Sequence, residues 1–439
     1  MVALQANTGQ PIPDVVWDGT MLSGKQANEI LCMRQNGEIS FVNLDAGNGF
    51  LLQTLILRIT IANFLPYQKF PYQQEQNEQN FCRCSIITAS FSLILGCSDA
   101  TPVFYESDNP QRLSDWNLFN LSSNDFVPSS ESIVFRPANQ LFTDYAHKLR
   151  TLWIPDGAQA MLVDGEIDYP AGTVLSKTFY YPTDSQGSPI RQPDFGDSSV
   201  NLSTNKLIET RLLVRRTNGW EAFPYVWNND QTEAFLRVAG ASTNIDLKSD
   251  IENFDFVYFV PNENQCAGCH VTEHPDGDMH PLGAIASQLS SSFLKNQSQI
   301  TALVDRGWLD QYPDVSSPIS WMDESANIDE RAQAYLNIHC GHCHNPSGAA
   351  DTSALLLDGS HNLLVNMGVC KRPVAAGGGA GNMLYSIVPG NPDRSILLYR
   401  MESDEPDEMM PELGRSIIHK EGINLIERWI REMPGSCPD

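Results

Sequence analysis

The chain contains two pentapeptides of one pattern, Cys266-Ala267-Gly268-Cys269-His270 and Cys340-Gly341-His342-Cys343-His344, and they decide how its second half can fold. The pattern Cys-x-x-Cys-His is the attachment sequence of a c-type haem. Its two cysteines form thioethers with the porphyrin, and the histidine that follows coordinates the iron. Two copies predict two covalently bound haem c groups, each held through its own cysteines and histidine.

Other sites also use paired cysteines, and the surrounding sequence argues against them. A zinc ribbon separates its two Cys-x-x-Cys pairs by about 15–20 residues, whereas the whole of residues 270–339 separates the pairs here. A thioredoxin-like redox pair is expected within a βαβ pattern, which is not found around either pentapeptide. Haem attachment is therefore the prediction, with zinc, a disulfide or a redox pair as the alternatives.

A methionine-containing loop supplies the predicted sixth ligand of the second iron. Residues 407–415 (DEMMPELGR) are interrupted by proline and glycine, and an amphipathic run from Glu421 to Met433 follows them. A methionine on such a loop can present its thioether sulfur to iron while the following helix packs on the haem. Met410 is the predicted ligand and Met409 the second choice. The alternative is that either methionine only fills the core.

The segment after the first pentapeptide offers weaker ligands for the first iron. It contains His274, Met279 and His280. His274 is too near His270 in sequence to reach the opposite face of the iron. His280 is the predicted ligand, and a solvated loop or a weak cation site are the alternatives for this segment.

Composition and charge limit the class of protein. The 439 residues are 41% hydrophobic and 18% charged, which is a globular composition with room for two or three domains. A net charge of −25 argues against a nucleic-acid partner, because such partners need a clustered positive field. The same charge would steer basic redox protein partners toward an acidic face. Ordinary solubility is the alternative explanation.

Residues 1–96 are predicted to be a leader, made of a non-native extension and a lipoprotein signal peptide. A short apolar run from Cys84 to Cys97 has the length of a signal peptide's apolar region and is too short to span a bilayer. Its end, Ile94-Leu95-Gly96-Cys97, resembles the bacterial lipobox. Cys97 is therefore the predicted lipidation site, and this lipid anchor is the expected membrane contact. An ordinary signal peptide, a buried hydrophobic segment and a genuine N-terminal extension are the alternatives.

Export is also what covalent haem attachment leads us to expect, because that attachment is completed outside the cytoplasm. The expected location is the periplasm or the outer membrane of a bacterium. Two cysteines beyond the leader, Cys370 and Cys437, belong to neither pentapeptide. In an oxidising compartment they are predicted to form a disulfide, with two free thiols as the alternative.

The rest of the chain is predicted to be multidomain. Residues 97–261 are expected to form a β-rich, sandwich-like domain that acts as a docking or spacing module, because short β-type runs alternate there with turn residues. Residues 262–325 form the predicted first haem-binding segment. Residues 326–439 form the predicted cytochrome c-like domain with the second haem, in an α-helical dihaem region of class I cytochrome c type. The predicted strands are Thr151–Ile154, Ala160–Val163, Thr178–Tyr181, Leu212–Arg216, Ala222–Trp227, Ala234–Val238 and Phe254–Val260.

The chain also resembles a family of dihaem c-type cytochromes often encoded beside a parallel β-helix repeat protein. The resemblance runs from about Phe104 to Met433. It implies an exported haem protein of electron transfer, with the β-helix protein as one candidate partner. The resemblance implies functional roles for both pentapeptides and for Met410-Pro411, whereas it identifies no sixth ligand for the first iron. The matching segments include Asn109–Ser114, Leu141–Arg150, Glu209–Val214, Tyr225–Asn228, Pro261–His270, Arg331-Ala332 with Tyr335-Leu336 before Cys340, and Met409–Trp429.

Three functions follow from these patterns. The first is an exported dihaem c-type cytochrome that passes electrons between periplasmic or surface redox partners, and is a carrier more than a catalyst. The second is a dihaem peroxidase-like oxidoreductase, in which one iron keeps an open position. The third is a partner-binding lipoprotein in which haem is mainly structural.

Overall fold

A computed structural model describes residues 101–293, 298–359, 364–374 and 376–438, together with the backbone of four strands nearer the N-terminus. The chain forms two compact units, Met1–Ser92 and Leu93–Asp439. In the first unit, β1 (Val2–Leu4) pairs with β2 (Pro11–Val16), and β3 (Glu29–Met33) pairs with β4 (Ile39–Asn43). The predicted signal peptide and lipidation site, Cys97, lie outside the described residues.

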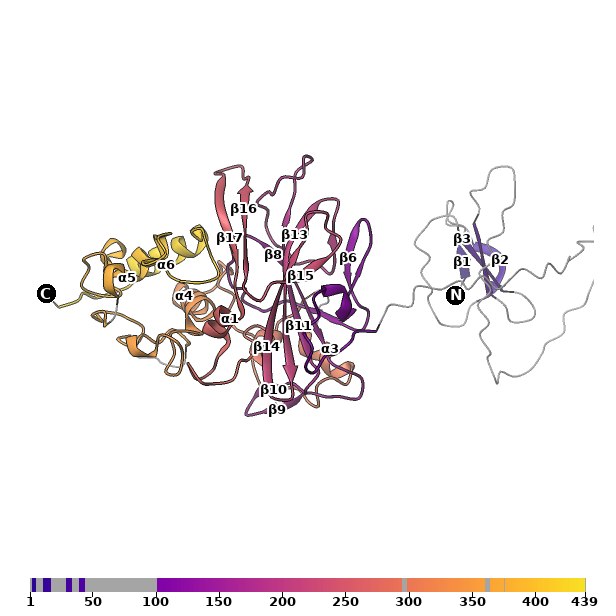
Figure 1. Ribbon diagram of the computed structural model, residues 1–439, viewed down its shortest axis with the longest axis horizontal. Helices are drawn as coiled ribbons and strands as arrows, with labels where there is room; N and C mark the ends of the chain where they lie inside the picture. Colours follow the sequence, from indigo (N-terminus) through magenta and orange to yellow (C-terminus); the bar gives the residue numbers. More distant parts are fainter. Residues whose placement is uncertain are drawn as a thin grey trace, which may run out of the picture. The chain divides into compact units, whose positions relative to one another are not determined.

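The second unit is built on a six-stranded antiparallel sheet with the strand order β15-β14-β13-β11-β8-β7 (Figure 1). Its central strands are rich in aromatic and β-branched residues, which fit a pleated and buried surface. The strands are β7 (Ile133–Phe135), β8 (His147–Trp153), β11 (Val174–Pro182), β13 (Asn205–Arg216), β14 (Gly219–Trp227) and β15 (Ala234–Leu236).

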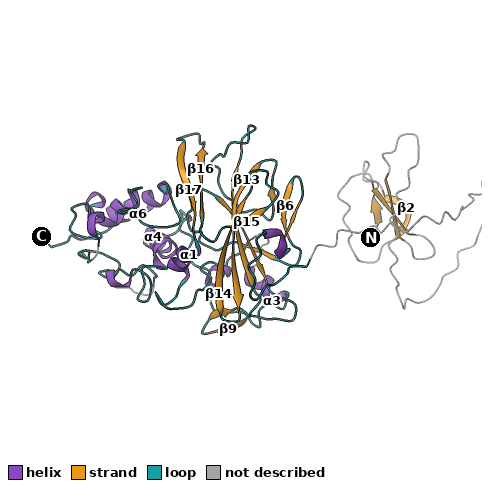
Figure 2. Ribbon diagram, viewed as in Figure 1, coloured by secondary structure: helices purple, strands orange, loops and turns teal. Residues whose placement is uncertain are grey.

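Three smaller sheets accompany the central one (Figure 2). The hairpin of β16 and β17 contributes Tyr258 and Phe256 to a core that also holds Phe179 and Tyr181 of β11. Burial alternates strictly along β17, so one of its faces covers this core. The remaining strands are β5 (Phe119–Leu121), β6 (Asp125–Pro128), β9 (Met161–Val163), β10 (Glu166–Asp168), β12 (Val200–Asn201), β16 (Ala241–Leu247) and β17 (Phe254–Val260).

The prediction of an α-helical, class I cytochrome c-like region is wrong. The second unit is β-rich, and its described residues contain six short α-helices, the longest of 13 residues, joined by irregular loops. Long loops with many proline and glycine residues separate these helices, so helix makes up only a small part of the region. The helices are α1 (Glu263–His270), α2 (Ala286–Leu289), α3 (Gln299–Asp305), α4 (Ile328–Leu336), α5 (Ile396–Glu402) and α6 (Lys420–Glu432).

Several short 3₁₀ turns and a π turn lie between these elements. Residues Pro392–Arg394 form a 3₁₀ turn directly before α5. The run before the second pentapeptide leaves α-geometry after Leu336 and continues as a π turn. The 3₁₀ turns are η1 (Leu113–Trp116), η3 (Asp351–Ser353), η4 (Gly377–Ala380) and η5 (Pro392–Arg394), and the π turn is η2 (Asn337–Gly341).

Helices α4, α5 and α6 enclose a second hydrophobic core. The apolar face of α6, including Ile426 and Trp429, packs there on Leu336 of α4. Gly422 lets the two helices approach, because a Cβ at that position would overlap the Tyr335 hydroxyl. This packing fixes the segments on either side of the second pentapeptide. Within the described residues, no helix has both the length and the apolar character needed to cross a bilayer.

Candidate functional site

The first pentapeptide lies at the end of α1, directly after the strand-rich region. The helix begins with a capping box: the Asn262 side chain accepts a hydrogen bond from Gln265 N, and the Gln265 side chain accepts one from Asn262 N, both at 2.9 Å. This cap satisfies two backbone donors at the start of a helix of only eight residues. It thereby fixes where Cys266 and His270 stand. Cys266 is buried in the core of the large sheet.

The His270 ring is oriented by a backbone carbonyl. Its Nδ1 lies 2.7 Å from the carbonyl oxygen of His280, which can only accept, so Nδ1 carries the proton. The His280 N–H in turn donates to the His270 carbonyl at 2.8 Å. Burial lowers the pKa of His270 to about 4. The ring is therefore neutral at ordinary pH and its Nε2 lone pair is free, which is the form in which imidazole binds a metal.

His280, the predicted ligand of the first iron, supplies this carbonyl on the Nδ1 side of His270. Its own ring is partly exposed, and its Nδ1 is buried with no hydrogen-bond partner. Burial also lowers its pKa. The structure thus brings His280 next to His270, but the His280 backbone lies on the Nδ1 side of the His270 ring, away from Nε2. The assignment of His280 as a sixth ligand stays a prediction.

The second pentapeptide begins in the π turn η2 and ends in the loop beyond it. The Asn327 side chain caps α4 by accepting a hydrogen bond from Asp329 N at 2.7 Å. Gly341 lies where the chain passes closely, because a Cβ there would stand 2.8 Å from the Asp358 Cα. The His344 Nδ1 is 3.4 Å from Ser353 Oγ. Burial lowers the pKa of His344 to about 4, so this imidazole is also neutral.

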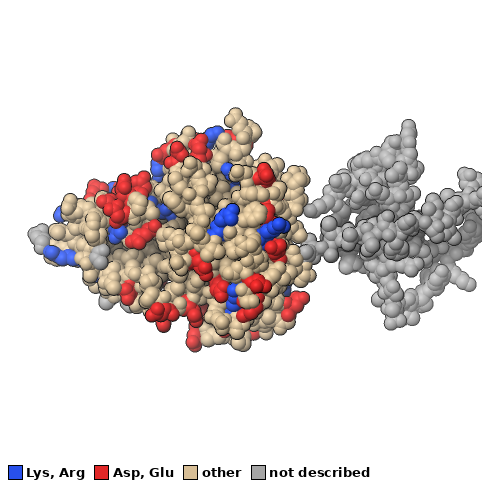
Figure 3. All heavy atoms as spheres, viewed as in Figure 1, with Lys and Arg blue, Asp and Glu red and all other residues tan. Residues whose placement is uncertain are grey.

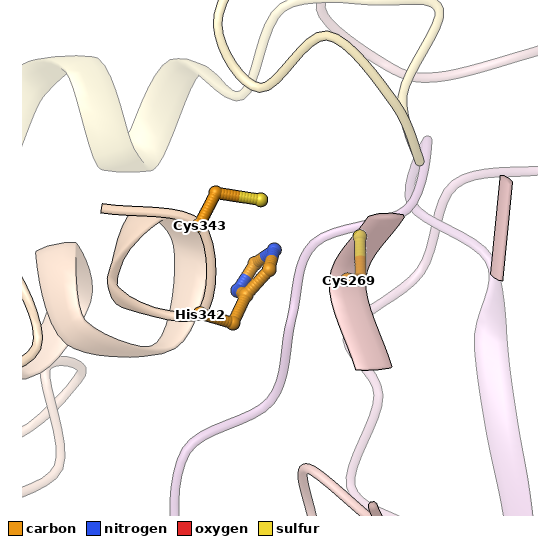
Figure 4. A group of neighbouring side chains, drawn as sticks. All are labelled: Cys269, His342 and Cys343. Carbon is orange, nitrogen blue, oxygen red and sulfur yellow. The ribbon is translucent and has the colours of Figure 1, made fainter. Parts of the chain in front are cut away.

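The two pentapeptides meet, although some 70 residues of sequence separate them. The ligand atoms of Cys269, His342 and Cys343 all lie within 4.8 Å of one another, and Figure 4 shows the three side chains converging from α1 and from the turn after η2. The Cys343 thiol also donates to the Gly268 carbonyl at 3.4 Å. A hydrogen bond between the two thiols lowers the pKa of Cys269 and raises that of Cys343, so the pair titrates as one unit.

A small cavity, partly open to solvent, lies beside Cys340 and has the predicted sixth ligand of the second iron in its wall. Met410 lines this cavity together with Cys340 and His419. Met409, by contrast, is buried at 8% exposure and its side chain is a core residue. Of the two methionines that the sequence offered, only Met410 is among the cavity-lining residues.

Arg415 holds the methionine loop in place. Its guanidinium donates to the Ser403 carbonyl at 2.8 Å and to the Met410 carbonyl at 3.0 Å from Nη2 and 3.2 Å from Nε. The loop is also tied to the strand-rich region, because the Asp144 carboxylate accepts from Ser416 N at 2.7 Å and Ile417 N at 3.0 Å. Sequence reasoning did not identify Arg415, since only the folded loop brings its acceptors together.

Two histidines that the sequence left without a role are buried at this cavity. His339 uses both ring nitrogens: Nδ1 lies 2.8 Å from the Tyr335 carbonyl, and Nε2 accepts from Phe142 N at 3.0 Å. His419 stacks on Phe142 with ring centroids 4.1 Å apart, and its Nδ1 is 3.0 Å from the Tyr335 hydroxyl. Apart from the contact between His339 and the Tyr335 carbonyl, these partners lie 84 to 277 residues away in sequence, so no local pattern reveals them.

The remaining cysteine pair forms a disulfide. The sulfurs of Cys370 and Cys437 are 2.09 Å apart and the Cα atoms 5.2 Å apart. The bond joins the end of the chain to the loop before α5, across 67 residues. The four pentapeptide cysteines are free thiols in the structure.

The comparisons with known proteins give no relative. No family model, no curated protein and no solved structure matches this chain. The resemblance to dihaem cytochromes therefore stays a prediction, and functional arguments rest on the geometry of the site itself.

Proposed function

We propose that this protein is an exported dihaem c-type cytochrome that transfers electrons between redox partners. The observation that carries the proposal is the state of the two pentapeptide histidines. Each is neutral, and His270 has its Nδ1 committed to a carbonyl and its Nε2 free. This is the arrangement that a histidine ligand to iron needs, with its orientation set by the hydrogen bond of the other nitrogen.

The residues around each pentapeptide suit the same group. Cys266 and Cys269 would hold one haem with His270, and Cys340 and Cys343 would hold the other with His344. Met410 lies in the cavity beside Cys340 and would complete a histidine and methionine pair there. Such a pair favours a high reduction potential, and haem supplies the one-electron chemistry.

The contact between the pentapeptides supports electron exchange between two centres. Cys269 and Cys343 belong to different pentapeptides, yet their sulfur atoms are within 4.8 Å. Electron transfer falls off steeply with distance, so attachment points this close favour a coupled pair. Export agrees with the Cys370–Cys437 disulfide, because such bonds persist in oxidising compartments.

The surface supports protein redox partners of basic character. The chain carries 53 acidic and 28 basic residues, and Figure 3 shows acidic side chains spread over the visible face. A surface of this sign attracts a positively charged partner and speeds its association at low salt. A peroxidase-like function remains the alternative, with the first iron keeping an open position.

A second candidate is a metal site, which the convergence of Cys269, His342 and Cys343 favours. Thiolate and imidazole are ligands that zinc takes, although a structural zinc site has four protein ligands. The described residues bring three such groups together at this point.

Measurements of haem and metal content test these proposals together. For protein matured in an exporting host, we expect an intact mass with two haems added and two low-spin irons in the absorption spectrum. A high-spin iron whose spectrum shifts with peroxide would favour the peroxidase. Colourless protein that contains zinc, or a Cys269–Cys343 disulfide, would refute the cytochrome.

A further inference from the structure

The large sheet carries a row of positive charges next to the first pentapeptide. Lys177 on β11 is paired directly with Arg150 on β8 and with Arg211 on β13. Residues directly opposite one another in a sheet point to the same face, and like charges in such positions repel. The three side chains therefore form a cross-strand row of cations, which we call the cation row.

A fourth cation and one acid flank the cation row on the same face. In the next register position, Phe179 is paired with Lys148 on one side and with Glu209 on the other. The ammonium of Lys177 lies 4.8 Å and the guanidinium of Arg211 4.5 Å from the Phe179 ring centroid. Positive charge is thus gathered around one aromatic side chain in the interior of an acidic protein.

Among the residues that the structure describes, only Arg211 of these four cations has a carboxylate in direct contact. Glu209, at 0% exposure, pairs with Arg211 through two hydrogen bonds of 2.8 and 2.5 Å. Two of the other cations donate to neutral groups: Arg150 Nη1 to Gln140 Oε1 at 2.6 Å, and Lys148 Nζ to the Ala146 carbonyl at 3.1 Å.

Within the described part of the chain, no carboxylate lies within 4.0 Å of Lys148, Arg150 or Lys177 in an ion pair. Arg150 and Lys148 are only 5% and 8% exposed. Burial lowers the pKa of Lys148 to about 7 and holds that of Lys177 well below its usual range, although nearby carboxylates oppose both shifts. A bound anion would keep both ammonium groups charged and would offset the cost of burying them.

The cation row reaches the first pentapeptide. The positive charge of Lys177 acts on the His270 ring, and that of Arg211 acts on the Cys266 thiol. Leu175 and Leu213, two residues along from the row on the same strands, belong to the same core as Cys266. Figure 1 shows α1, which carries this pentapeptide, beside β14 of the sheet, and the two elements are in contact.

We propose that the cation row of Arg150, Lys177 and Arg211 binds the propionate carboxylates of the haem attached at Cys266 and Cys269. The inference rests on the proposed function and extends it. Carboxylate and guanidinium or ammonium groups form charge-assisted hydrogen bonds, which are the strong ones in a protein interior. The strand-rich region is then part of the first haem site, in place of the docking or spacing module that its sequence suggested.

The sign of a stability change tests this proposal in the haem-loaded protein. In Lys177→Gln, the propionate loses its central partner, so we expect Tm to fall by several degrees. If no anion occupies the row, the same change removes repulsion between like charges and Tm rises. Arg237→Gln is the matched control, because Arg237 is an exposed cation at the edge of the same region and its loss should leave Tm unchanged.

A second readout is the reduction potential of the haem. Loss of a nearby positive charge disfavours the reduced form, and a tenfold change in that equilibrium lowers the potential by about 59 mV. Lys177→Gln is expected to show this shift at one of the two haems, and Lys177→Arg to restore the potential. An unchanged pair of potentials, with both haems present, would overturn the propionate site and leave the proposed function intact.

A free anion could supply the same carboxylate-like chemistry. Phosphate and acetate are therefore added to the wild-type protein at millimolar concentration. If either raises Tm, and Lys177→Gln abolishes that increase, the row binds a dissociable anion and the propionate assignment is overturned. Haem content is measured first in every variant, so that an absence of haem is recognised as failure of the proposed function.

Discussion

The two pentapeptides share five positions but stand in different surroundings. The first ends a capped α-helix beside the large sheet, and its histidine is oriented by a main-chain carbonyl. The second begins inside a π turn, and its cavity is lined by a loop that Arg415 and Asp144 hold. The first site therefore depends on the strand-rich region, whereas the second depends on long-range side-chain contacts. The same attachment chemistry can be expected to give two irons of different character.

Removal of one cysteine pair at a time is expected to have the largest effect, because it eliminates one haem site and leaves the other to be characterised alone. Serine cannot form a thioether, so Cys266→Ser/Cys269→Ser and Cys340→Ser/Cys343→Ser should each lose one haem and about half of the haem absorbance. The spectra that remain should differ, and only the protein that keeps the second pentapeptide should show a sulfur-to-iron band. Intact mass and absorption spectra measure both effects.

The disulfide provides a control for these cysteine variants. Cys370→Ser/Cys437→Ser removes the same number of sulfur atoms but should keep both haems, because neither cysteine belongs to a pentapeptide. Loss of both haems from either pentapeptide variant would show that the two sites do not fill independently.

Substitution of Met410 sharpens the comparison at the second site alone. Met410→Ala removes the thioether that lines the cavity beside Cys340, so the sulfur-to-iron band near the red edge of the spectrum should disappear. Haem content and the other iron should be unaffected.

Met409→Ala is the matched variant. Met409 is buried in the core, and its truncation should cost about 2–5 kcal/mol of stability while the band remains. A Met410→Ala protein that retained the band would remove Met410 from the ligand assignment.

Local sequence patterns predicted the strands far better than the arrangement of the C-terminal half. Each predicted run overlaps a strand, from β8 to β17, because alternation and β-branched residues are local properties. The short strands β5, β6, β7, β10 and β12 were missed, as was β16, since Ala241–Leu247 is rich in small and polar residues. The prediction of a helical cytochrome c region was wrong because the pentapeptides and short periodic runs do not specify how much of the chain between them is helical.

The site was predictable where its chemistry is contiguous in sequence. Each pentapeptide is a contiguous motif of five residues, and the proline after Met410 indicated that this methionine lies in a loop. The cation row was not predictable, because Arg150, Lys177 and Arg211 come from three strands and only the register aligns them. The carboxylate of Asp144 bonds to residues 272 and 273 positions away, which no pattern along the chain reveals.

Asp144 links the second site to the sheet region, and its substitution should affect that site and leave the first unchanged. The residue has a φ of 46°, which asparagine tolerates and alanine does not favour. Asp144→Asn keeps an acceptor for Ser416 N and Ile417 N, whereas Asp144→Ala leaves both donors unpaired. We expect the alanine variant to lose about 1–3 kcal/mol for each unsatisfied group and to weaken the Met410 band.

The pH dependence of stability in wild type and Asp144→Asn tests the contact of Asp144 with Ser416 N and Ile417 N. Burial raises the pKa of Asp144 from 3.8 to about 6. Its stabilising contribution is therefore fully present below pH 3.8, where the carboxyl is protonated, and is lost as the pH rises through about 6. A rise of about 2 in pKa corresponds to about 3 kcal/mol.

The asparagine in Asp144→Asn cannot ionise. The stability of this variant relative to wild type should therefore increase by up to about 3 kcal/mol between pH 4 and pH 7. Chemical unfolding of both proteins across this pH range measures the difference between their free energies of unfolding. The contributions of the other carboxylates are the same in both proteins and cancel in this difference. A difference that stayed constant with pH would mean that the Asp144 carboxyl is hydrated, and that the second site is attached to the sheet by other contacts.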